Sequence, residues 1–370
     1  MKPNNGIIIV TGSNGRIGDA VMRRFAGRYG DVVGFDRKSP KSPPPGCVYV
    51  PVEITSDENV REGMTVIREH HGSHVAAVVH LAAYYDFFGE PSTKYEEITI
   101  NGTGRLLHTL HELDFQVEQF LFSSTMLVHE SAEPGQFINE DWPIGPTWAY
   151  PASKVRTEAV ITELRGEIPA IFHRIAGVYD DLCHSIPLAN QIQRIHEKQF
   201  TSRLYSGSTS HGQSFVHMDD AVDAIDLTVE RRAELPPELP LLIGEPETLG
   251  YDELQHTFAR LIYGQNWETL EIPPQLGPLT KVGTWLLDKL PGSKAFIRPW
   301  MIDRANDHYA LDIARARNLL GWEPRHSLRE TLPKMIAALK ADPLGWYEEN
   351  GLEAPRRLQQ EAERPPESAQ

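Results

Sequence analysis

A tyrosine and a lysine, Tyr150 and Lys154, stand four residues apart, with Pro151 next to the tyrosine. This spacing places both side chains on one face of a helix. An unperturbed phenol has a pKa of about 10, which is too high for a general base at neutral pH, and a neighbouring ammonium group favours the phenolate. The pair therefore predicts proton transfer to or from a hydroxyl group, with Tyr150 as the general acid or base.

A third candidate, Thr125, ends the segment Phe122-Ser-Ser-Thr125, which follows a short apolar run. The run is typical of a buried strand, so the threonine would lie just past a strand end. Its hydroxyl could hold the same substrate oxygen as Tyr150. Tyrosine and lysine at helical spacing occur by chance in many chains, and the added hydroxyl favours a catalytic set of Thr125, Tyr150 and Lys154.

A glycine-rich turn near the N-terminus predicts where a cofactor would bind. Gly12, Gly15 and Gly18 lie between the apolar run at 6–10 and a segment of helical length. Glycines there let the main chain turn tightly and approach a pyrophosphate, whose charge is met by free N–H groups at the helix N-terminus. The turn therefore predicts a dinucleotide site.

Two charged residues bear on which dinucleotide is used. Asp36, eighteen residues after Gly18, would accept hydrogen bonds from the adenosine ribose hydroxyls and repel a ribose phosphate. Arg37 is the complication, because its guanidinium could pair with a 2′-phosphate if Asp36 turned away. We expect NAD as the cofactor, with NADP as the less favoured alternative. Hydride would then pass to or from the nicotinamide while Tyr150 moves the proton.

The elements that must position these groups follow from the apolar pattern. We expect strands at 6–10, 32–35, 48–52, 75–81, 119–123 and 170–174, separated by helices such as 16–28 and 101–113. Continuous apolar runs are typical of strands buried on both faces of a parallel sheet. Their alternation with helices predicts a Rossmann-type, doubly wound α/β sheet with right-handed crossovers.

After about residue 176 the alternation becomes irregular, with helices expected at 187–198, 219–231 and 312–320. The last of these has Asp312 as a plausible N-cap and Gly321 in the left-handed C′ position. We expect three parts, which are a cofactor-binding domain at 1–176, a mainly substrate-binding lobe at 177–352 and a flexible tail at 353–370. Some elements of the lobe should return to the first domain, and the lobe should cover the carboxyl ends of the strands.

Composition narrows the partners and the compartment. The 370 residues carry a formal net charge of −15 without a basic cluster, so nucleic acid is not an expected partner. Two cysteines, and an N-terminus without the basic and apolar regions of an export signal, favour the cytoplasm. The nearest approach to a membrane element is the amphipathic segment 279–290, which we expect to pack on protein, without stable membrane insertion.

Histidines offer no clear metal site. Three of them lie in the polar segment 70–74 with no cysteine nearby, so we interpret them as solvated and expect no metal. His80 lies within an expected strand and should be a hydrogen-bonded core residue. His217 and Asp219 are expected to position a loop of the substrate lobe.

Taken in order, these motifs resemble those of an extended short-chain dehydrogenase/reductase, the group that includes nucleotide-sugar epimerases and dehydratases and the 3β-hydroxysteroid dehydrogenases. The resemblance covers nearly the whole chain, and it places Thr125 on the catalytic Ser/Thr of the group. It implies a homodimer through two helices per subunit, and a small-molecule substrate. The cofactor contacts that the motifs and the resemblance imply are Gly12, Asn14, Gly15, Arg16, Ile17, Gly18, Asp36, Arg37, Glu53, Ile54, Leu81, Ala82, Ala83, Asn101, Tyr150 and Lys154.

The expected substrate contacts depart from the nucleotide-sugar members. Gly177 stands where those members usually carry Asn, and Gln213 where an Arg usually grips the diphosphate. Losing such a charge-assisted contact would remove on the order of 1.5 to 3 kcal/mol of binding, which disfavours a nucleotide sugar. Ala176 and Gly177 after Arg174 look like the steroid-dehydrogenase and ketoreductase branch, whereas Asp219-Asp220 and the ending Leu-Gly-Trp-Glu-Pro look more like the sugar epimerases.

Tyr84-Tyr85-Asp86-Phe87-Phe88 follows Ala83 directly, and its four aromatic residues could line an apolar substrate pocket or form a packed loop. Tyr84 and Tyr85 are the substrate contacts that we expect from this run. Three functions remain open from the sequence. The first is a dehydrogenase or ketoreductase acting on a secondary alcohol or ketone. The second is an epimerase or dehydratase that retains its NAD. The third is a catalytically silent dinucleotide sensor, against which the intact Tyr150 and Lys154 argue.

Overall fold

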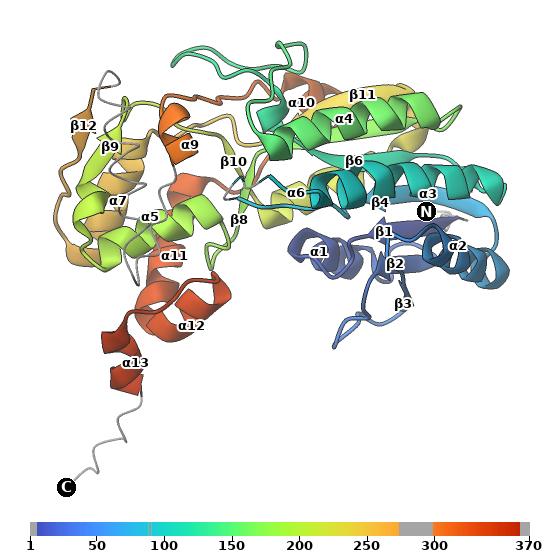
Figure 1. Cartoon of the computed structure of the whole chain (residues 1–370), viewed down its shortest axis with the longest axis horizontal. Coiled ribbons are helices and arrows are strands. Elements are labelled where there is room, and N and C mark those ends of the chain that lie inside the picture. The colour runs from blue at the N-terminus through green and yellow to red at the C-terminus, as the bar shows by residue number, and fades with distance from the viewer. Residues whose placement is uncertain (1–5, 88, 90, 274–298, 363–370) are drawn as a thin grey trace, which may run out of the picture.

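The computed structural model describes residues 6–87, 89, 91–273 and 299–362 of the chain. Figure 1 shows two adjoining parts, a sheet with helices on both faces and a smaller group of helices and short strands. The chain passes between these parts more than once, because a strand at 238–243 returns to the sheet after the chain has entered the smaller group. The sheet is the frame on which the candidate site is built.

Eight strands form the main sheet, and every neighbouring pair runs parallel within the described residues. The strand order is β11-β7-β6-β4-β1-β2-β3, with β5 beside β4. The strands are β1 (Ile7–Thr11), β2 (Val32–Asp36), β3 (Cys47–Pro51), β4 (His74–His80), β5 (Gln116–Val117), β6 (Phe120–Thr125), β7 (Ala170–Ile175) and β11 (Glu238–Ile243). The order reverses direction at β1, which confirms the predicted Rossmann-type, doubly wound class.

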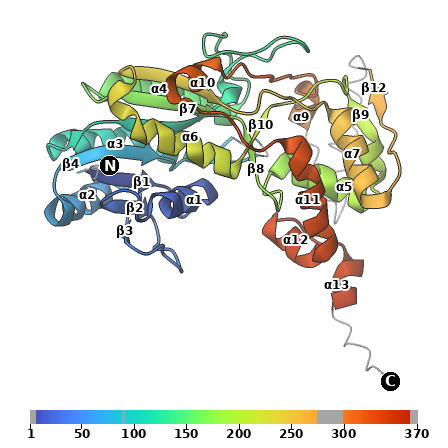
Figure 2. The same ribbon diagram turned by 180° about the vertical axis from the view of Figure 1, so that it is seen from behind.

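The continuous apolar run of β1 follows from helices on both faces of the sheet. Ile7 and Ile9 belong to the core that contains residues of α2, α3 and α4, whereas Ile8 and Val10 belong to the core that contains α1 and α6. Figure 2 shows α6 and α1 along one face of the sheet. The covering helices are α1 (Arg16–Phe25), α2 (Asp57–His71), α3 (Asn101–Glu112), α4 (Ala149–Leu164) and α6 (Met218–Glu230).

The smaller part has its own apolar core, which includes the buried side chains of Phe258, Trp346 and Tyr347. It contains two short parallel strand pairs and a set of helices that pack on one another (Figure 1). Its elements are β8 (Gly177–Tyr179) with β10 (Phe215–His217), β9 (Leu204–Ser206) with β12 (Leu270–Ile272), α5 (Ile186–His196), α7 (Tyr251–Tyr263), α9 (Pro299–Asp303), α11 (Leu328–Ala341) and α12 (Pro343–Glu349).

Two segments near the C-terminus differ from the sequence-based expectation, namely the start of the helix expected at 312–320 and the tail expected at 353–370. The helix expected at 312–320 begins at Ala314 as α10 (Ala314–Leu320), and the carboxylate of Asp312 accepts the N–H of Ala314 from one residue outside the cap. The reason is that the N–H of Asp312 donates to the carbonyl of Ile138, beside the bridge between Ile138 and Leu311, and this contact holds Asp312 outside the helix. Gly321 ends the helix at φ 65°, as predicted.

The segment after residue 353, expected to be a flexible tail, contains the short helix α13 (Arg356–Ala362). The side chains of Leu358 in this helix and of Ala354 before it pack against the core of the smaller part, and this contact stabilises the helix. The amphipathic segment expected at 279–290 lies outside the described residues. Among the helices that the structure describes, none combines the length and the apolar character needed to cross a membrane.

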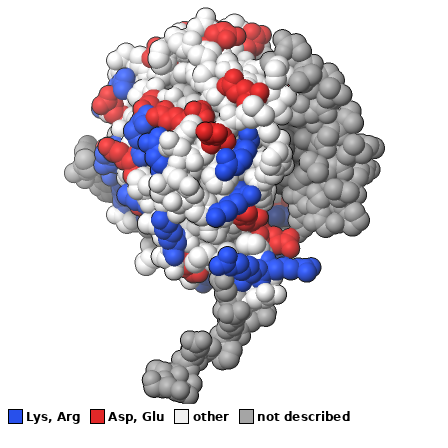
Figure 3. All heavy atoms as spheres, turned by 90° about the vertical axis from the view of Figure 1, so that its left-hand side faces the viewer, with Lys and Arg blue, Asp and Glu red and all other residues white. Residues whose placement is uncertain are grey.

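On the face of the molecule formed by the smaller part, acidic and basic side chains are interspersed (Figure 3). Within the smaller part, Arg329 in α11 pairs with both Glu247 and Glu253 at 2.7 Å and 2.5 Å. Exposed pairs of this kind contribute little to stability, about 0 to 1 kcal/mol each.

Candidate active site

Tyr150 and Lys154 lie in the first turns of α4, which starts after Trp148 in extended backbone. Pro151 fits there because the first N–H groups of a helix have no partner within it. Lys154 is 2% exposed, and its ammonium donates to the carbonyl of Ser123 at 2.6 Å. The Nζ atom lies 5.8 Å from the centre of the Tyr150 ring. The helix therefore brings the phenol and the ammonium together at the end of β6.

Thr125, the last residue of β6, is buried beside these two groups. Its hydroxyl lies close enough to Tyr150 to lower the pKa of the phenol, and it accepts the N–H of Leu127 at 3.4 Å. The sequence-predicted set of Thr125, Tyr150 and Lys154 is thus gathered at one place, although 25 residues separate the threonine from the tyrosine along the chain. Such an array can polarise a substrate oxygen and transfer a proton to or from it.

The surroundings shift the pKa values of both titratable groups. Burial lowers the pKa of Lys154 to about 7, against the opposing effect of the nearby Glu158 charge. Burial also raises the pKa of Tyr150 above its ordinary value, and the nearby Thr125 hydroxyl works in the opposite direction. A buried lysine that titrates near neutral pH beside a tyrosine is typical of a functional site, where groups change protonation during the reaction.

Aromatic rings connect Tyr150 to the smaller part. The ring of Tyr85 meets the Tyr150 ring edge-on at 4.8 Å, and that of Trp148 lies 5.5 Å away. Trp148 in turn stacks on Trp300 of α9 at 5.1 Å. Tyr84 points elsewhere, because its N–H donates to Thr99 and its ring packs on a neighbouring tyrosine. Of the two predicted aromatic contacts, only Tyr85 touches the candidate acid/base.

A cavity of about 530 Å³ opens next to this aromatic group. Its wall is mostly apolar, with Trp148 and Trp300 at the side of Tyr150, and Gln213 lies in its wall as predicted. Ala176 and Gly177 are not among its lining residues. A side chain at Gly177 would collide with the ring of Phe215, which does line the cavity, at 2.8 Å. Glycine at 177 therefore leaves room for an aromatic wall.

Sequence reasoning missed several residues of this wall. Phe87, which belongs to the aromatic run after Ala83 that the sequence singled out, is not one of these missed residues. Among the missed ones, Arg194 and Arg304 bring positive charge to the wall, and Trp300 adds aromatic surface. Trp148 had a usable signal, because it stands two residues before Tyr150. The others come from segments far apart in the chain, and no local pattern marks them.

The glycine turn has the close contacts that a dinucleotide cradle needs. A Cβ at Gly18 would lie 2.1 Å from the carbonyl oxygen of Gly12, and a Cβ at Gly12, which has φ 67°, would lie 2.8 Å from the backbone nitrogen of Ala82. The hydroxyl of Thr11 holds the opposite side, since it accepts the N–H groups of Leu81 and Ala82 at 3.2 Å each. The backbone therefore leaves no space for side chains where a pyrophosphate would approach.

The carboxylate of Asp36 is fixed toward this turn. One oxygen accepts the N–H of Asn14 at 3.0 Å, and the other accepts the N–H of Arg37 at 2.7 Å. The side chain of Asn14 donates to the carbonyl of Lys38. Asp36 therefore faces the glycine turn. Arg37 would favour a 2′-phosphate only if Asp36 were turned away from it.

The remaining predicted cofactor contacts lie near the carboxyl ends of β1 to β4. Arg16 differs from the others, because its side chain is bonded to another part of the chain. Gly15 precedes α1, and Ile17 lies in its first turn. Ile54 packs against the start of α3 beside Asn101, since a Cβ at Gly102 would lie 3.1 Å from its side chain. The guanidinium of Arg16 instead donates to the carbonyl of Glu349 in α12 at 2.7 Å.

Two loop residues of the predicted set are also accounted for. Glu53 follows β3, and its carboxylate accepts the N–H and the hydroxyl of Thr55 at 3.3 Å and 3.0 Å. Ala83 continues the loop after β4 that passes over the turn. His80, at the end of β4, bonds Thr11 at 2.7 Å and Thr103 at 2.8 Å, so it is the hydrogen-bonded core residue that the sequence predicted.

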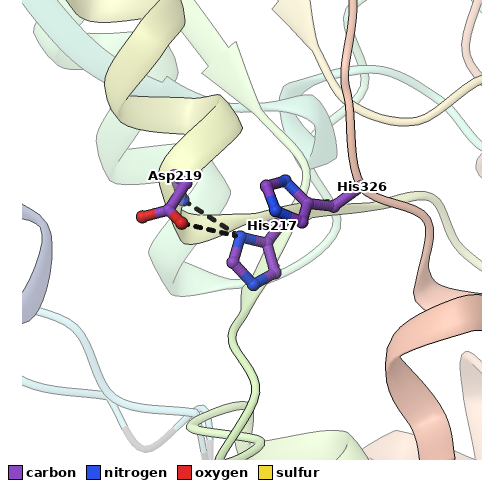
Figure 4. Close-up of side chains that lie close together, drawn as sticks. All are labelled: His217, Asp219 and His326. Atoms are coloured by element: carbon purple, nitrogen blue, oxygen red, sulfur yellow. Dashed lines mark hydrogen bonds and ion pairs between the residues drawn. The ribbon is translucent and has the colours of Figure 1, made fainter. Parts of the chain in front are cut away.

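His217, Asp219 and His326 form a group that could hold a metal ion, since one ligand atom from each lies within 4.8 Å of the others (Figure 4). Each imidazole also has a structural partner. The Nδ1 atom of His217 accepts the N–H of Asp219 at 3.2 Å and caps α6, and Nδ1 of His326 lies 3.1 Å from the carboxylate of Asp220. The two rings stack at 4.0 Å. The group joins β10 and α6 to the segment before α11.

Comparison with known proteins identifies the family of the chain. Residues 8–244 match the sequence model of the NAD dependent epimerase/dehydratase family. The chain is 23% identical over 347 residues to dTDP-6-deoxy-L-talose 4-dehydrogenase (NAD(P)(+)) of Kitasatospora kifunensis, a match that covers 91% of this chain and 96% of that protein. It is 22% identical over 369 residues to human 3 beta-hydroxysteroid dehydrogenase type 7, covering 90% and 96% of the two chains.

Solved structures show the same fold. The dTDP-glucose 4,6-dehydratase of Bacillus anthracis, in complex with NAD, superposes with a TM-score of 0.66 at 17% identity and covers 93% of this chain and 99% of its own. The UDP-glucose 4-epimerase of Thermotoga maritima, with UDP-glucose, superposes with a TM-score of 0.65 at 22% identity and covers 90% and 99%.

Proposed function

Because the chain belongs to the NAD-dependent epimerase/dehydratase family, we propose that it is an NAD-dependent oxidoreductase that transfers hydride at a secondary alcohol or ketone. One observation carries the proposal, which is the meeting of Thr125, Tyr150 and Lys154 at the end of β6 beside a mostly apolar cavity. The chain is an enzyme of a family that uses NAD, and this array supplies the proton transfer that accompanies hydride transfer.

The residues around the turn fit NAD. The tight backbone from Gly12 to Gly18 and the free N–H groups at the start of α1 would hold the pyrophosphate. Asp36, fixed by two backbone N–H groups, still has lone pairs for the ribose hydroxyls and favours NAD over NADP. When bound, NAD accepts the hydride from the alcohol carbon or returns it to the carbonyl carbon.

The protein residues then handle the proton and the oxygen. Thr125 donates a hydrogen bond to the substrate oxygen, and Tyr150 takes its proton during oxidation or supplies one during reduction. The charged form of Lys154 favours the phenolate and also holds the nicotinamide ribose. Burial lowers the pKa of Lys154 to about 7. At neutral pH the charge of this lysine is therefore sensitive to the groups packed around it.

The cavity supports an apolar substrate body. Leu188, Phe215 and Leu254 are among its lining residues, and Gln213 supplies an amide where a guanidinium would grip a diphosphate. The name of the human relative, a steroid dehydrogenase, agrees with an alcohol on an apolar skeleton. The dTDP-sugar dehydrogenase name of the bacterial relative points to a sugar instead. The neutral Gln213 removes one expected diphosphate contact, whereas Arg194 and Arg304 in the same wall are the groups that could meet an anionic substrate.

A cofactor turnover assay tests the proposal. The purified protein is mixed with NAD and a panel of hydrophobic secondary alcohols, and NADH is followed by its absorbance. Steady NADH formation with at least one alcohol is the expected result. Protein that carries tightly bound NAD through gel filtration and interconverts sugars without net NADH formation would contradict the proposal and favour the epimerase or dehydratase function.

A further inference from the structure

The catalytic face of α4 continues one turn beyond Lys154 to Glu158. Tyr150, Lys154 and Glu158 follow one another at intervals of four residues, and each meets one of the three last residues of β6. Tyr150 contacts Thr125, Lys154 donates to the carbonyl of Ser123, and Glu158 accepts the hydroxyl of Ser124. Three consecutive turns of the helix therefore contact the end of the strand. The proposed mechanism uses the residues of only two of these turns.

Glu158 is also half of a buried ion pair with Arg174 of β7. The guanidinium donates to the two carboxylate oxygens at 2.7 Å and 3.3 Å, and the side chains are 12% and 9% exposed. Arg174 also donates to Nε2 of His129 and to the carbonyl of Glu140, both at 3.2 Å. The arginine is thus fixed by several partners, and it pairs with the carboxylate that lies one helical turn from Lys154.

We propose that Glu158 is a positioning residue that holds Lys154 in its charged form, and that Arg174, as the buried partner of Glu158, limits this effect. The inference rests on the proposed function for its catalytic meaning. The electrostatic arrangement itself is a property of the folded chain and can be measured without a substrate.

The pKa of Lys154 depends on its burial and on the charges around it. Burial alone lowers the pKa of the lysine, and Glu158 raises it again. The facing imidazole of His80 on β4 is buried, and its pKa is lowered to about 3, so it is neutral. His129, next to Arg174, is also neutral at physiological pH because burial and the Arg174 charge lower its pKa to about 4. Glu158 is therefore the charged neighbour that acts on the ammonium, and Arg174 acts through its ion pair with Glu158.

Removing either partner should move the titration of Lys154, and the two removals should act in opposite directions. Glu158→Gln leaves the Arg174 charge unopposed, which disfavours the ammonium, so the pKa of Lys154 falls. Arg174→Gln leaves the Glu158 charge unopposed, which favours the ammonium, so the pKa rises. We expect shifts of about one pH unit each way. Lys154 must be charged for activity, so the alkaline loss of activity should move to lower pH in the first variant and to higher pH in the second.

The experiment is a titration of the full-length protein carrying lysine labelled with ¹³C at the ε-carbon, followed by NMR. Lys154→Met identifies the signal of Lys154 by its loss. The expected result is opposite displacement of this signal's midpoint in Glu158→Gln and Arg174→Gln, and return toward the wild-type midpoint in the double variant. The pH dependence of NADH formation should follow the same order.

A merely structural role gives a different pattern. Both single variants would then lose thermal stability and activity while the Lys154 midpoint stayed fixed or moved the same way, and that outcome overturns the proposal. If a single variant does not fold, Glu158→Asp and Arg174→Lys keep each charge, and they should preserve the midpoint. Opposite NMR shifts in a protein that oxidises no alcohol would leave this inference standing and remove the proposed function.

Discussion

The cofactor side and the substrate side of this molecule are built by different means. At the glycine turn the shape is made by the backbone, and a single added Cβ at Gly18 would meet a carbonyl oxygen at 2.1 Å. At the cavity the shape is made by side chains such as Trp148, Phe215 and Trp300, which come from three separate segments. Backbone shape is set by a short motif, whereas a side-chain wall depends on tertiary packing.

This difference has a consequence for substitutions. A change at the turn should affect binding of the cofactor and leave the cavity intact, and a change in the aromatic wall should do the reverse. Tyr150 lies between the two regions, because its ring contacts Trp148 and its phenol lies near Thr125. Variants on either side therefore separate the two contributions.

Among substitutions that leave the acid/base residue itself in place, the largest effect is expected from Gly18→Ala. The new methyl group would collide with the backbone of Gly12, so the turn must open, and NAD affinity should fall about 100-fold. Isothermal titration with NAD measures the change. Gly104→Ala is the matched control, because a Cβ there would meet Leu164 at an ordinary 3.6 Å and should leave NAD affinity unchanged. Wild-type NAD affinity in Gly18→Ala would contradict the placement of the pyrophosphate.

Trp148→Ala should act on the other side. Its side chain forms no cap hydrogen bond for α4, so the helix start should survive, while the cavity loses one wall. Loss of one large aromatic contact should raise KM for the alcohol about tenfold with little change in NAD affinity. Steady-state kinetics and NAD titration on the same sample check this. A drop in NAD affinity equal to the rise in KM would show that the two regions are not separable.

A smaller effect is expected from Asp36→Asn. The substitution removes the charge that repels a ribose phosphate and weakens the hydrogen bonds to the ribose hydroxyls, so the preference for NAD over NADP should fall about three- to tenfold. The measurement is kcat/KM with each cofactor. An unchanged ratio would mean that Asp36 does not face the ribose.

The contrast between the two regions also explains what the sequence could predict. The parallel sheet, six of its eight strands to within two residues, the family and the use of NAD follow from short patterns such as those around Gly12, Asp36 and Tyr150. The short β5 and the late strand β11 were not predicted. These features are local because strand, turn and helix are adjacent in the chain. The roles of the individual site residues remain predictions.

The cavity could not be predicted in the same way. Trp300 stacks on Trp148 across about 150 residues of sequence, and neither residue carries a pattern that marks its partner. Gln213 was identified only because a charged residue was expected at its place. The ion pair of Glu158 with Arg174 is of the same kind, since the register of α4 on β6 and β7 becomes visible only when the chain is folded.

The central claim is that Tyr150 moves the proton, and Tyr150→Phe tests it most directly. With an alcohol that the wild type oxidises, NADH formation in this variant should fall by about 10²- to 10⁴-fold while NAD affinity stays near the wild-type value. Tyr263→Phe, which removes a phenol in α7 that bonds the carbonyl of His196, serves as the control and should retain activity. Undiminished NADH formation in Tyr150→Phe would contradict the account.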